Sequence, residues 1–200
     1  MKNKILITGS KGFVARQLIP LLGQKYEVVG ITEDVLDVEK LRPYFKDADF
    51  VIHLAVKKDD GNECYKIVIE GTKNVASLCQ EYGCKLVNFS SEYAGTNPNS
   101  PYAVGKMEAE KFLGKYVDNG LKAISLRPCG IVDQNWFDSS GNKLNIFRGR
   151  SYPIGRLCKN IEKIIENYDF KNYKVYKTYL PFAKMLYLMG RVYRAIKRRI

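Results

Sequence analysis

The stretch "ILITGSKGFVA", residues 5–15, decides the fold, because it predicts a buried strand that runs through a glycine turn into a helix. Gly9, Gly12 and Ala15 stand three residues apart along it. Glycines let a backbone approach a pyrophosphate closely, and the N-terminus of the helix offers free N–H groups and a positive dipole end. Because the turn follows the first strand of an expected parallel sheet, we predict a dinucleotide site here rather than a plain turn.

Short apolar runs and longer amphipathic segments alternate over the rest of the first two-thirds of the chain, a pattern typical of a parallel sheet with crossover helices. It predicts an α/β fold, a doubly wound parallel sheet. Further strands are expected at 26–32, 49–55, 85–91, 121–127 and 173–179, and helices at 12–24, 64–83, 100–120 and 156–168. The connection 35–47 has room for a short helix at most. Residues 134–155 read as a loop.

The composition predicts one folded domain without a metal site. Hydrophobic residues make up 46% of the 200, which is too many for a disordered chain. Five cysteines occur without a C-x-x-C pair and with one histidine, His53, so we expect neither a zinc site nor a disulfide framework. No apolar run reaches the length of a membrane span, and the N-terminal one is too short for a secretory signal, so we expect a cytoplasmic protein.

Positive charge is concentrated in the last thirty residues. The formal net charge is +12, and nine Lys or Arg with no acidic residue occur from Lys171 onward. This distribution does not predict a nucleic-acid-binding surface. Residues 181–200 predict a basic amphipathic helix that packs on the domain or on a partner subunit, as in a homodimer. A sharper alternative is peripheral contact with an anionic membrane, at the inner face of the membrane.

The stretch "SPYAVGK", residues 100–106, places Tyr102 and Lys106 on one helix face. Ser100 can cap that helix, and Pro101 suits its first position. Such pairs often occur by chance on a helix surface. A strand that ends in Ser90 and Ser91 some ten residues earlier, together with the N-terminal glycine turn, favours a site instead.

Six segments in this order, "TGSKGFVA", "DFVIHLA", "GTKNV", "FSSEYAG", "PYAVGK" and "LRP", resemble the extended short-chain dehydrogenase/reductases, which are NAD(P)-dependent epimerases, dehydratases and reductases acting mainly on nucleotide sugars. The resemblance covers residues 4–132 and implies a Rossmann-type sheet. It implies that Tyr102 transfers a proton at a substrate oxygen, and that Lys106 lowers the tyrosine pKa and binds the nicotinamide ribose. The hydroxyl that bonds the substrate oxygen would come from Ser91, which we prefer because strand register is harder to shift than a loop; counting back from Gly95 would select Ser90 instead.

The resemblance also implies which residues bind the cofactor. Ala55 follows the strand that holds His53, whose own role we expect to be structural. Asp37 resembles an adenine-contacting aspartate, although a plain helix cap is an equal alternative. The implied cofactor residues are Gly9, Ser10, Lys11, Gly12, Phe13, Val14, Thr32, Asp37, Leu54, Ala55, Tyr102, Lys106 and Pro128.

The choice between NAD and NADP depends on two opposing charges. The position that often holds an acid for the adenosine ribose is Thr32, followed by Glu33. Glu33 would repel a 2′-phosphate, whereas Lys11 could attract one. On balance the sequence favours NAD weakly.

Finer details indicate a branch of the family and two departures from it. The tripeptide Ser91-Glu92-Tyr93 is similar to the Thr-Asp-Tyr of dTDP-4-dehydrorhamnose reductases, which disfavours dehydration and favours 4-keto reduction or epimerisation. Val68 replaces an Asn that family members use structurally and in proton relay. The C-terminal lobe looks reduced. We therefore expect an NAD(P)-binding domain at 1–150, a substrate-lobe remnant at 151–180 and the basic helix at 181–200. These departures keep open an alternative function, a catalytically weak NAD(P)-binding scaffold or sensor.

Overall fold

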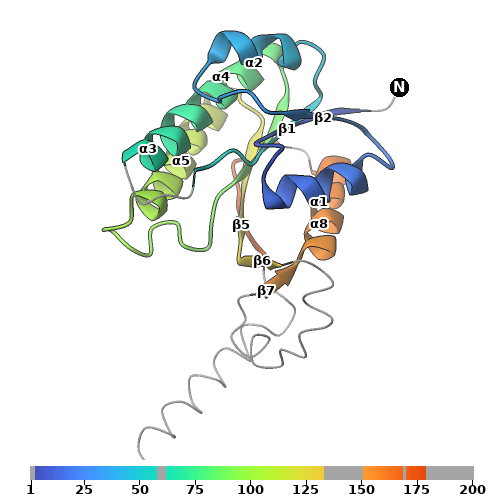
Figure 1. Cartoon of the computed structure of the whole chain (residues 1–200). Coiled ribbons are helices and arrows are strands. Elements are labelled where there is room, and N and C mark those ends of the chain that lie inside the picture. Colours follow the sequence, from blue (N-terminus) through green and yellow to red (C-terminus); the bar gives the residue numbers. More distant parts are fainter. Residues whose placement is uncertain (1–2, 58–61, 133–150, 169, 179–200) are drawn as a thin grey trace, which may run out of the picture.

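Parallel strands form the centre of the computed structural model, which describes residues 3–57, 62–132, 151–168 and 170–178 (Figure 1). The central sheet has the order β2-β1-β3-β4-β5-β8, and every pairing in it is parallel. This order confirms the predicted doubly wound sheet. The strands are β1 (Lys4–Thr8), β2 (Glu27–Ile31), β3 (Phe50–His53), β4 (Lys85–Phe89), β5 (Ala123–Pro128) and β8 (Val175–Thr178).

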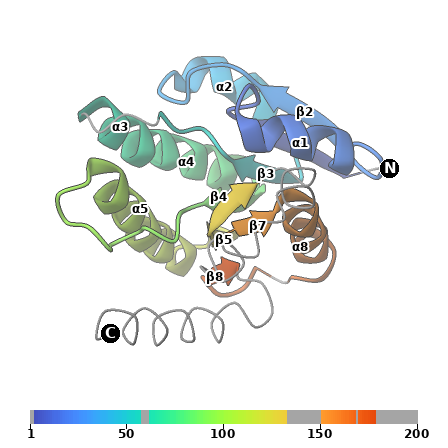
Figure 2. The same ribbon diagram turned by 60° about the horizontal axis from the view of Figure 1, so that its bottom comes forward.

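Helices cover both faces of the sheet, as Figure 2 shows from a second direction. Along each strand, alternate apolar side chains enter two separate cores, since successive side chains point to opposite faces. Ile5 and Ile7 pack with α1 and α8, whereas Leu6 packs with α2, α4 and α5. The helices are α1 (Phe13–Leu22), α2 (Val38–Phe45), α3 (Asn62–Lys66), α4 (Thr72–Tyr82), α5 (Pro101–Asp118) and α8 (Ile154–Asn167).

The segment predicted as a substrate-lobe remnant, residues 151–180, packs with the sheet domain wherever the structure describes it. Helix α8 lies in the segment assigned to a separate lobe remnant, yet its buried side chains Leu157 and Ile161 join the core on the α1 face. Strand β8 pairs with β5, for example Leu126 with Tyr176. A free edge of β5 would leave its backbone N–H and C=O groups unpaired, and β8 satisfies them. The segment therefore completes the sheet domain.

The helix predicted at 64–83 is interrupted by a π-helix, Ile67–Gly71, between α3 and α4. Val68 lies within it, is almost fully buried, and faces α5: a Cβ atom added to Gly105 would meet Val68 Cγ1 at 3.2 Å. Segments of π-helix are frequent at functional sites. In this chain the segment supports the start of α5, where Tyr102 and Lys106 lie.

Two short strands next to the sheet were not predicted, β6 (Gly130–Val132) and β7 (Ser151–Pro153), which pair in parallel. Strand β7 lies inside the segment expected to be a loop.

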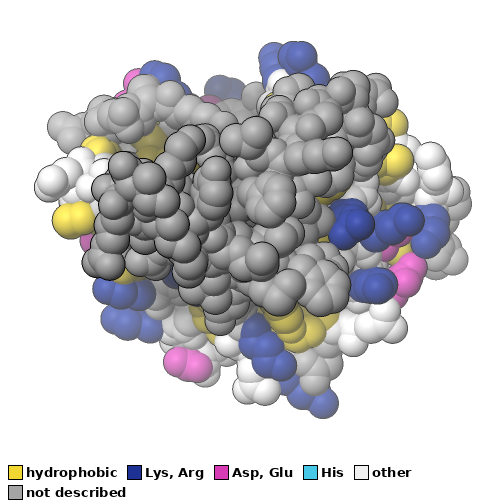
Figure 3. All heavy atoms as spheres, turned by 90° about the horizontal axis from the view of Figure 1, so that it is seen from below, with side chains coloured by type: hydrophobic (Ala, Val, Ile, Leu, Met, Phe, Trp, Pro, Cys, Tyr) yellow, Lys and Arg dark blue, Asp and Glu magenta, His cyan; other side chains and the backbone are white. Residues whose placement is uncertain are grey.

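Among the described residues, no helix has both the length and the apolar character needed to cross a bilayer. On the face seen from below in Figure 3, Lys and Arg side chains outnumber acidic ones among the coloured residues. The helix predicted at 181–200 lies outside the described residues.

Candidate functional site

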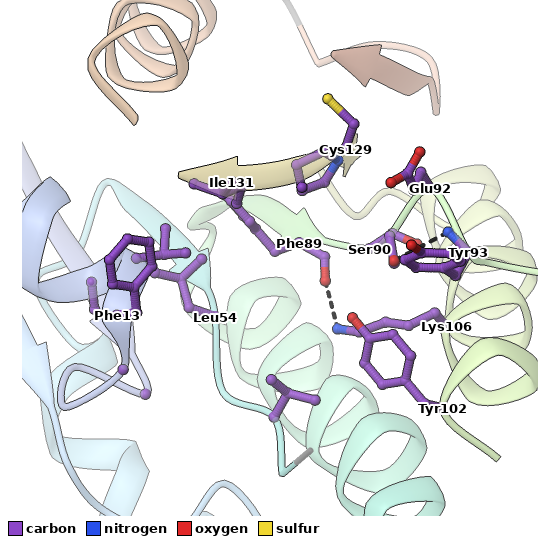
Figure 4. Close-up of a pocket in the computed structure, with 18 of the residues that line it drawn as sticks. Phe13, Leu54, Phe89, Ser90, Glu92, Tyr93, Tyr102, Lys106, Cys129 and Ile131 are labelled. Carbon is purple, nitrogen blue, oxygen red and sulfur yellow. Dashed lines mark hydrogen bonds between the residues drawn. The ribbon is translucent and has the colours of Figure 1, made fainter. Parts of the chain in front are cut away.

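A pocket of about 920 Å³ opens where the carboxyl ends of the strands meet the glycine turn and the start of α5 (Figure 4). Such a volume is typical of small-molecule sites. All three residues predicted to be catalytic line it, and so do eleven of the thirteen predicted cofactor residues. The lining residues predicted from the sequence are Gly9, Ser10, Lys11, Gly12, Phe13, Val14, Thr32, Leu54, Ser91, Tyr102, Lys106 and Pro128.

Two predicted cofactor residues are not among the lining residues of this pocket. Asp37 is the N-cap of α2: its Oδ1 accepts from the Lys40 N–H at 3.2 Å, and its other oxygen pairs with Lys40 Nζ at 2.7 Å. The plain cap is thus the alternative that the structure supports. Ala55 lies behind the pocket wall, against Gly9.

The glycine turn has the geometry that a pyrophosphate requires. Gly9 has φ of +67°, and a Cβ atom there would come within 2.8 Å of Ala55 Cα, so backbone fills the space that a side chain would need. Gly12 is the N-cap of α1 and provides no side-chain cap. Because glycine has no side chain to cap the helix, no N-cap side chain occupies the first N–H groups of α1, which lie beside the pocket. A dinucleotide fits these residues.

His53 has a structural environment and is neutral. Burial lowers its pKa to about 3, with the nearby Lys106 charge as a second cause. Its Nδ1 lies 2.8 Å from Thr8 Oγ1, and that oxygen also accepts from the N–H groups of Leu54 and Ala55, at 3.2 and 3.3 Å. The direction of the hydrogen bond between Thr8 and Nδ1 depends on the His53 tautomer, and Nε2 is buried with no hydrogen-bond partner among the described residues. The contact between Thr8 and His53 joins the ends of β1 and β3 below the glycine turn.

Tyr102 points into the pocket from the first turn of α5 (Figure 4), and Ser91, which follows the end of β4, lines the same pocket. Helix α5 begins as predicted, since the Ser100 hydroxyl accepts from the Ala103 N–H at 3.3 Å. Burial raises the pKa of Tyr102, and a hydrogen bond with the Ser91 side chain opposes that rise. The Tyr102 hydroxyl is therefore protonated at neutral pH, ready to act as an acid.

Lys106 is the most deeply buried cation of the site. Its Nζ donates to the Phe89 carbonyl at 2.6 Å and lies 5.9 Å from the centre of the Tyr102 ring. Burial lowers the pKa of Lys106 to about 8. The causes of the raised Tyr102 pKa are burial first, then Ser91, which lowers it, and Cys64, which raises it; that Lys106 lowers this pKa stays a prediction.

A pH-dependent stability is expected from this buried ammonium. The ordinary pKa of Lys is 10.5 and that of Lys106 is about 8, so between these values the unfolded chain binds more protons than the folded one. Stability should therefore rise with pH across that window, by about 3 kcal/mol in total, and the gain should be lost as pH falls through about 8. Urea unfolding of the wild type and Lys106→Met, near pH 7 and near pH 10, measures the difference. Equal pH dependence in both proteins would contradict the assignment.

The sequence favours Ser91 over Ser90 beside Tyr102, and several lining residues were not predicted from it. Both serines line the pocket, but only Ser91 is a hydrogen-bond partner that shifts the Tyr102 pKa, whereas Ser90 Oγ is buried with no partner among the described residues. Lining residues without a predicted site role are Ala15, Val56, Phe89, Glu92, Tyr93, Ser100, Cys129, Gly130 and Ile131. Most of them directly follow the end of β3, β4 or β5, a position that could have identified them.

No group of three or more metal-ligating side chains occurs within the described ranges.

Several known proteins are similar to this chain in sequence or in structure. A family model described as "NAD dependent epimerase/dehydratase family" matches residues 5–142, more than half of the chain. A UDP-N-acetylglucosamine 4,6-dehydratase (inverting) of Campylobacter jejuni is 36% identical over 84 residues, which cover 39% of this chain and 25% of the relative. The chain spans less than half the length of the first curated relatives that it matches, 44% or 25%.

Two further relatives align over nearly the whole chain. The N-acetyl-alpha-D-glucosaminyl-diphospho-ditrans,octacis-undecaprenol 4-epimerase of Escherichia coli O157:H7 is 24% identical, with 100% of this chain and 74% of the relative covered. A solved dTDP-4-dehydrorhamnose reductase from Bacillus anthracis, in complex with NADP, has a TM-score of 0.71 at 19% identity and covers 96% of this chain and 82% of that one. At this identity the second likeness concerns the fold alone.

Proposed function

The chain belongs to the NAD-dependent epimerase/dehydratase family, and from that premise we propose that it is an NAD(P)-dependent enzyme that reduces or epimerises a nucleotide sugar at a 4-keto or 4-hydroxyl carbon. One observation carries the proposal: Ser91, Tyr102 and Lys106 open into the same pocket as the glycine turn. An acid, its hydrogen-bonding neighbour and a dinucleotide cradle thus share one space.

The roles of the three side chains follow from their contacts. The nicotinamide, when bound, supplies or accepts the hydride. Tyr102 donates its proton to the oxygen of a ketone while the carbon receives the hydride, which yields an alcohol; in the reverse direction the phenolate takes that proton. Ser91 holds the same oxygen by a hydrogen bond. Lys106, fixed by the Phe89 carbonyl, supplies a positive charge and donors toward the cofactor ribose.

Reduction or epimerisation is favoured over dehydration because of the residues beside Ser91. Elimination of water needs a second group that removes a proton from carbon. The residue after Glu92 is not a second acid but a tyrosine, Tyr93, which is 49% exposed and lines the pocket. Proteins similar to this chain are named as a dehydratase, an epimerase and a reductase, so family membership alone does not select the reaction. The weak preference for NAD rests on Glu33, next to Thr32.

A panel of nucleotide sugars tests the proposal. The chain is incubated with UDP- and dTDP-linked hexoses and their 4-keto forms, with NAD, NADH, NADP or NADPH. Nicotinamide absorbance reports net oxidation or reduction, and product analysis detects redox-neutral epimerisation. Turnover of at least one sugar is expected.

A second function, a catalytically weak NAD(P)-binding scaffold or sensor, is favoured by one observation. Val68 occupies the position of a proton-relay Asn and is buried and apolar. Binding of a dinucleotide without turnover of any sugar in the panel would favour this function over the first. Failure to bind any dinucleotide would overturn both.

Other partners and the location of the protein remain proposals. A homodimer and peripheral contact of the basic tail with an anionic membrane both depend on residues 181–200, and we keep cytoplasmic residence as an expectation. Sedimentation with anionic and with neutral vesicles separates the membrane contact from its absence.

A further inference from the structure

An unusual carboxylate contact lies at the end of β2, where the adenosine ribose of a dinucleotide would bind. Thr32 lines the pocket there, and the next residue, Glu33, has both of its carboxylate oxygens bonded. Oε2 accepts from the Thr32 N–H at 3.0 Å, and Oε1 accepts from the Tyr44 hydroxyl at 2.7 Å. The carboxylate is therefore held in one orientation by its own strand end and by a residue of α2.

Tyr44 is well placed to hold that carboxylate. It belongs to α2, and its ring is half-buried against the core formed by α2, α4 and α5. An aromatic ring has few rotatable bonds, so the hydroxyl is positioned at little entropic cost. The hydrogen bond from Tyr44 is also the largest cause of the lowered pKa of Glu33, which keeps the carboxylate charged.

The other acids of this turn are engaged by their own local backbone. Asp34 Oδ1 accepts from the Leu36 N–H at 3.0 Å, and Asp37 caps α2. Glu33 is the acid at this corner that a side chain from a separate element orients. It is thus the strongest candidate to receive a ribose hydroxyl, since a carboxylate can accept about four hydrogen bonds and two are used.

An opposing charge comes from the glycine turn. Lys11 lines the pocket and is close enough for its charge to act on Glu33. The turn is fixed next to β2: the Ser10 N–H donates to the Ile31 carbonyl at 3.1 Å, and a Cβ atom on Gly30 would meet Ser10 Cβ at 2.8 Å. A cation that attracts a 2′-phosphate lines this corner, and an anion that repels one lies near it, directly after the lining residue Thr32.

We propose that Tyr44 is a specificity-determining residue, a positioning residue that holds the Glu33 carboxylate at the ribose corner and so makes the pocket prefer NAD(H) over NADP(H) despite Lys11. The inference rests on the proposed function only in that the pocket binds a dinucleotide. Removal of the Tyr44 hydroxyl frees the carboxylate to turn toward solvent or toward Lys11. Repulsion of the 2′-phosphate should then weaken, together with the bond to the 2′-hydroxyl.

The experiment measures dissociation constants of NADH and NADPH by nicotinamide fluorescence for the wild type, Tyr44→Phe and Glu33→Gln. The wild type is expected to bind NADH more tightly. Tyr44→Phe should reduce the NADPH-to-NADH ratio of dissociation constants roughly 3- to 10-fold. The double variant Tyr44→Phe/Glu33→Gln should resemble Glu33→Gln, because Tyr44 acts through that carboxylate.

Tyr26→Phe is a matched control. Tyr26 is also half-buried and donates its hydroxyl to a glutamate, Glu166, at 3.2 Å, but it lies before the opposite end of β2. It should leave the ratio unchanged. The inference is overturned if the wild type prefers NADPH, if Tyr44→Phe leaves the ratio as it is, or if both tyrosine variants shift it equally. A wild type that binds neither dinucleotide would instead overturn the proposed function itself.

Discussion

Tyr102→Phe is expected to lower turnover of the sugar found in the panel by roughly 10²- to 10⁴-fold, which is the contribution of a positioned acid. The variant loses the hydroxyl that donates to the substrate oxygen and keeps the ring that packs beside Val68 and Tyr65. The urea midpoint should change little, and cofactor affinity should change far less than turnover, because the ring remains in the pocket wall. Steady-state kinetics and fluorescence titration with NADH measure the two effects separately.

Tyr116→Phe is the control for this variant. Tyr116 lies on the same helix, half-buried against Phe112, and is not among the residues that line the pocket. It should retain wild-type turnover. A Tyr102→Phe enzyme that retained wild-type turnover would falsify the assigned acid.

Gly9→Ala is expected to cost about 3 kcal/mol of unfolding free energy, or more, and to weaken dinucleotide binding at least tenfold. The backbone at Gly9 has φ of +67°, and the new Cβ would lie 2.8 Å from Ala55 Cα and 2.9 Å from Ala55 N. These atoms belong to the backbone that follows β3, so they cannot move aside as the end of a flexible side chain would. Either the variant shifts the glycine turn, which displaces N–H groups from a pyrophosphate, or it strains the sheet edge.

Gly83→Ala separates the two costs of that change. Gly83 ends α4 with φ of +75°, yet a Cβ atom there meets nothing within 4 Å. It should cost only the left-handed conformation, about 1 kcal/mol, and leave NADH affinity unchanged. Urea unfolding and NADH titration of both variants test this. Equal losses in both would contradict the role of the close approach at Gly9.

Much of the candidate site was predictable because its parts are local in the chain. The glycine turn and the Tyr102–Lys106 pair each lie within one strand–turn–helix or one helix turn, so spacing alone places their side chains. The choice between Ser90 and Ser91 was different, since a shift of one residue reverses the face of a strand. In the structure both serines line the pocket; Ser91 opposes the rise of the Tyr102 pKa, whereas Ser90 Oγ is buried without a partner among the described residues.

Other features were out of reach of sequence patterns. Strand β8 is short and partly exposed, and nothing in its residues specifies that β5 is its neighbour. The pocket wall contributed by Cys129 and Ile131 depends on a chain segment that lacks a periodic pattern. Pairing over such distances is decided by which edge stays unsatisfied after the other strands have assembled.

By itself, the sequence determined a parallel α/β sheet with a dinucleotide turn at its first strand, because buried two-sided strands and phosphate-binding glycines have local signatures. Only the tertiary structure decided that residues 151–178 complete that sheet, that Tyr44 from α2 holds Glu33, and that burial moves the pKa of Tyr102 up and that of Lys106 down. The physical reason is the same in each case. Desolvation, edge pairing and side-chain hydrogen bonds between elements depend on neighbours that are distant along the chain, and the fold brings those neighbours together.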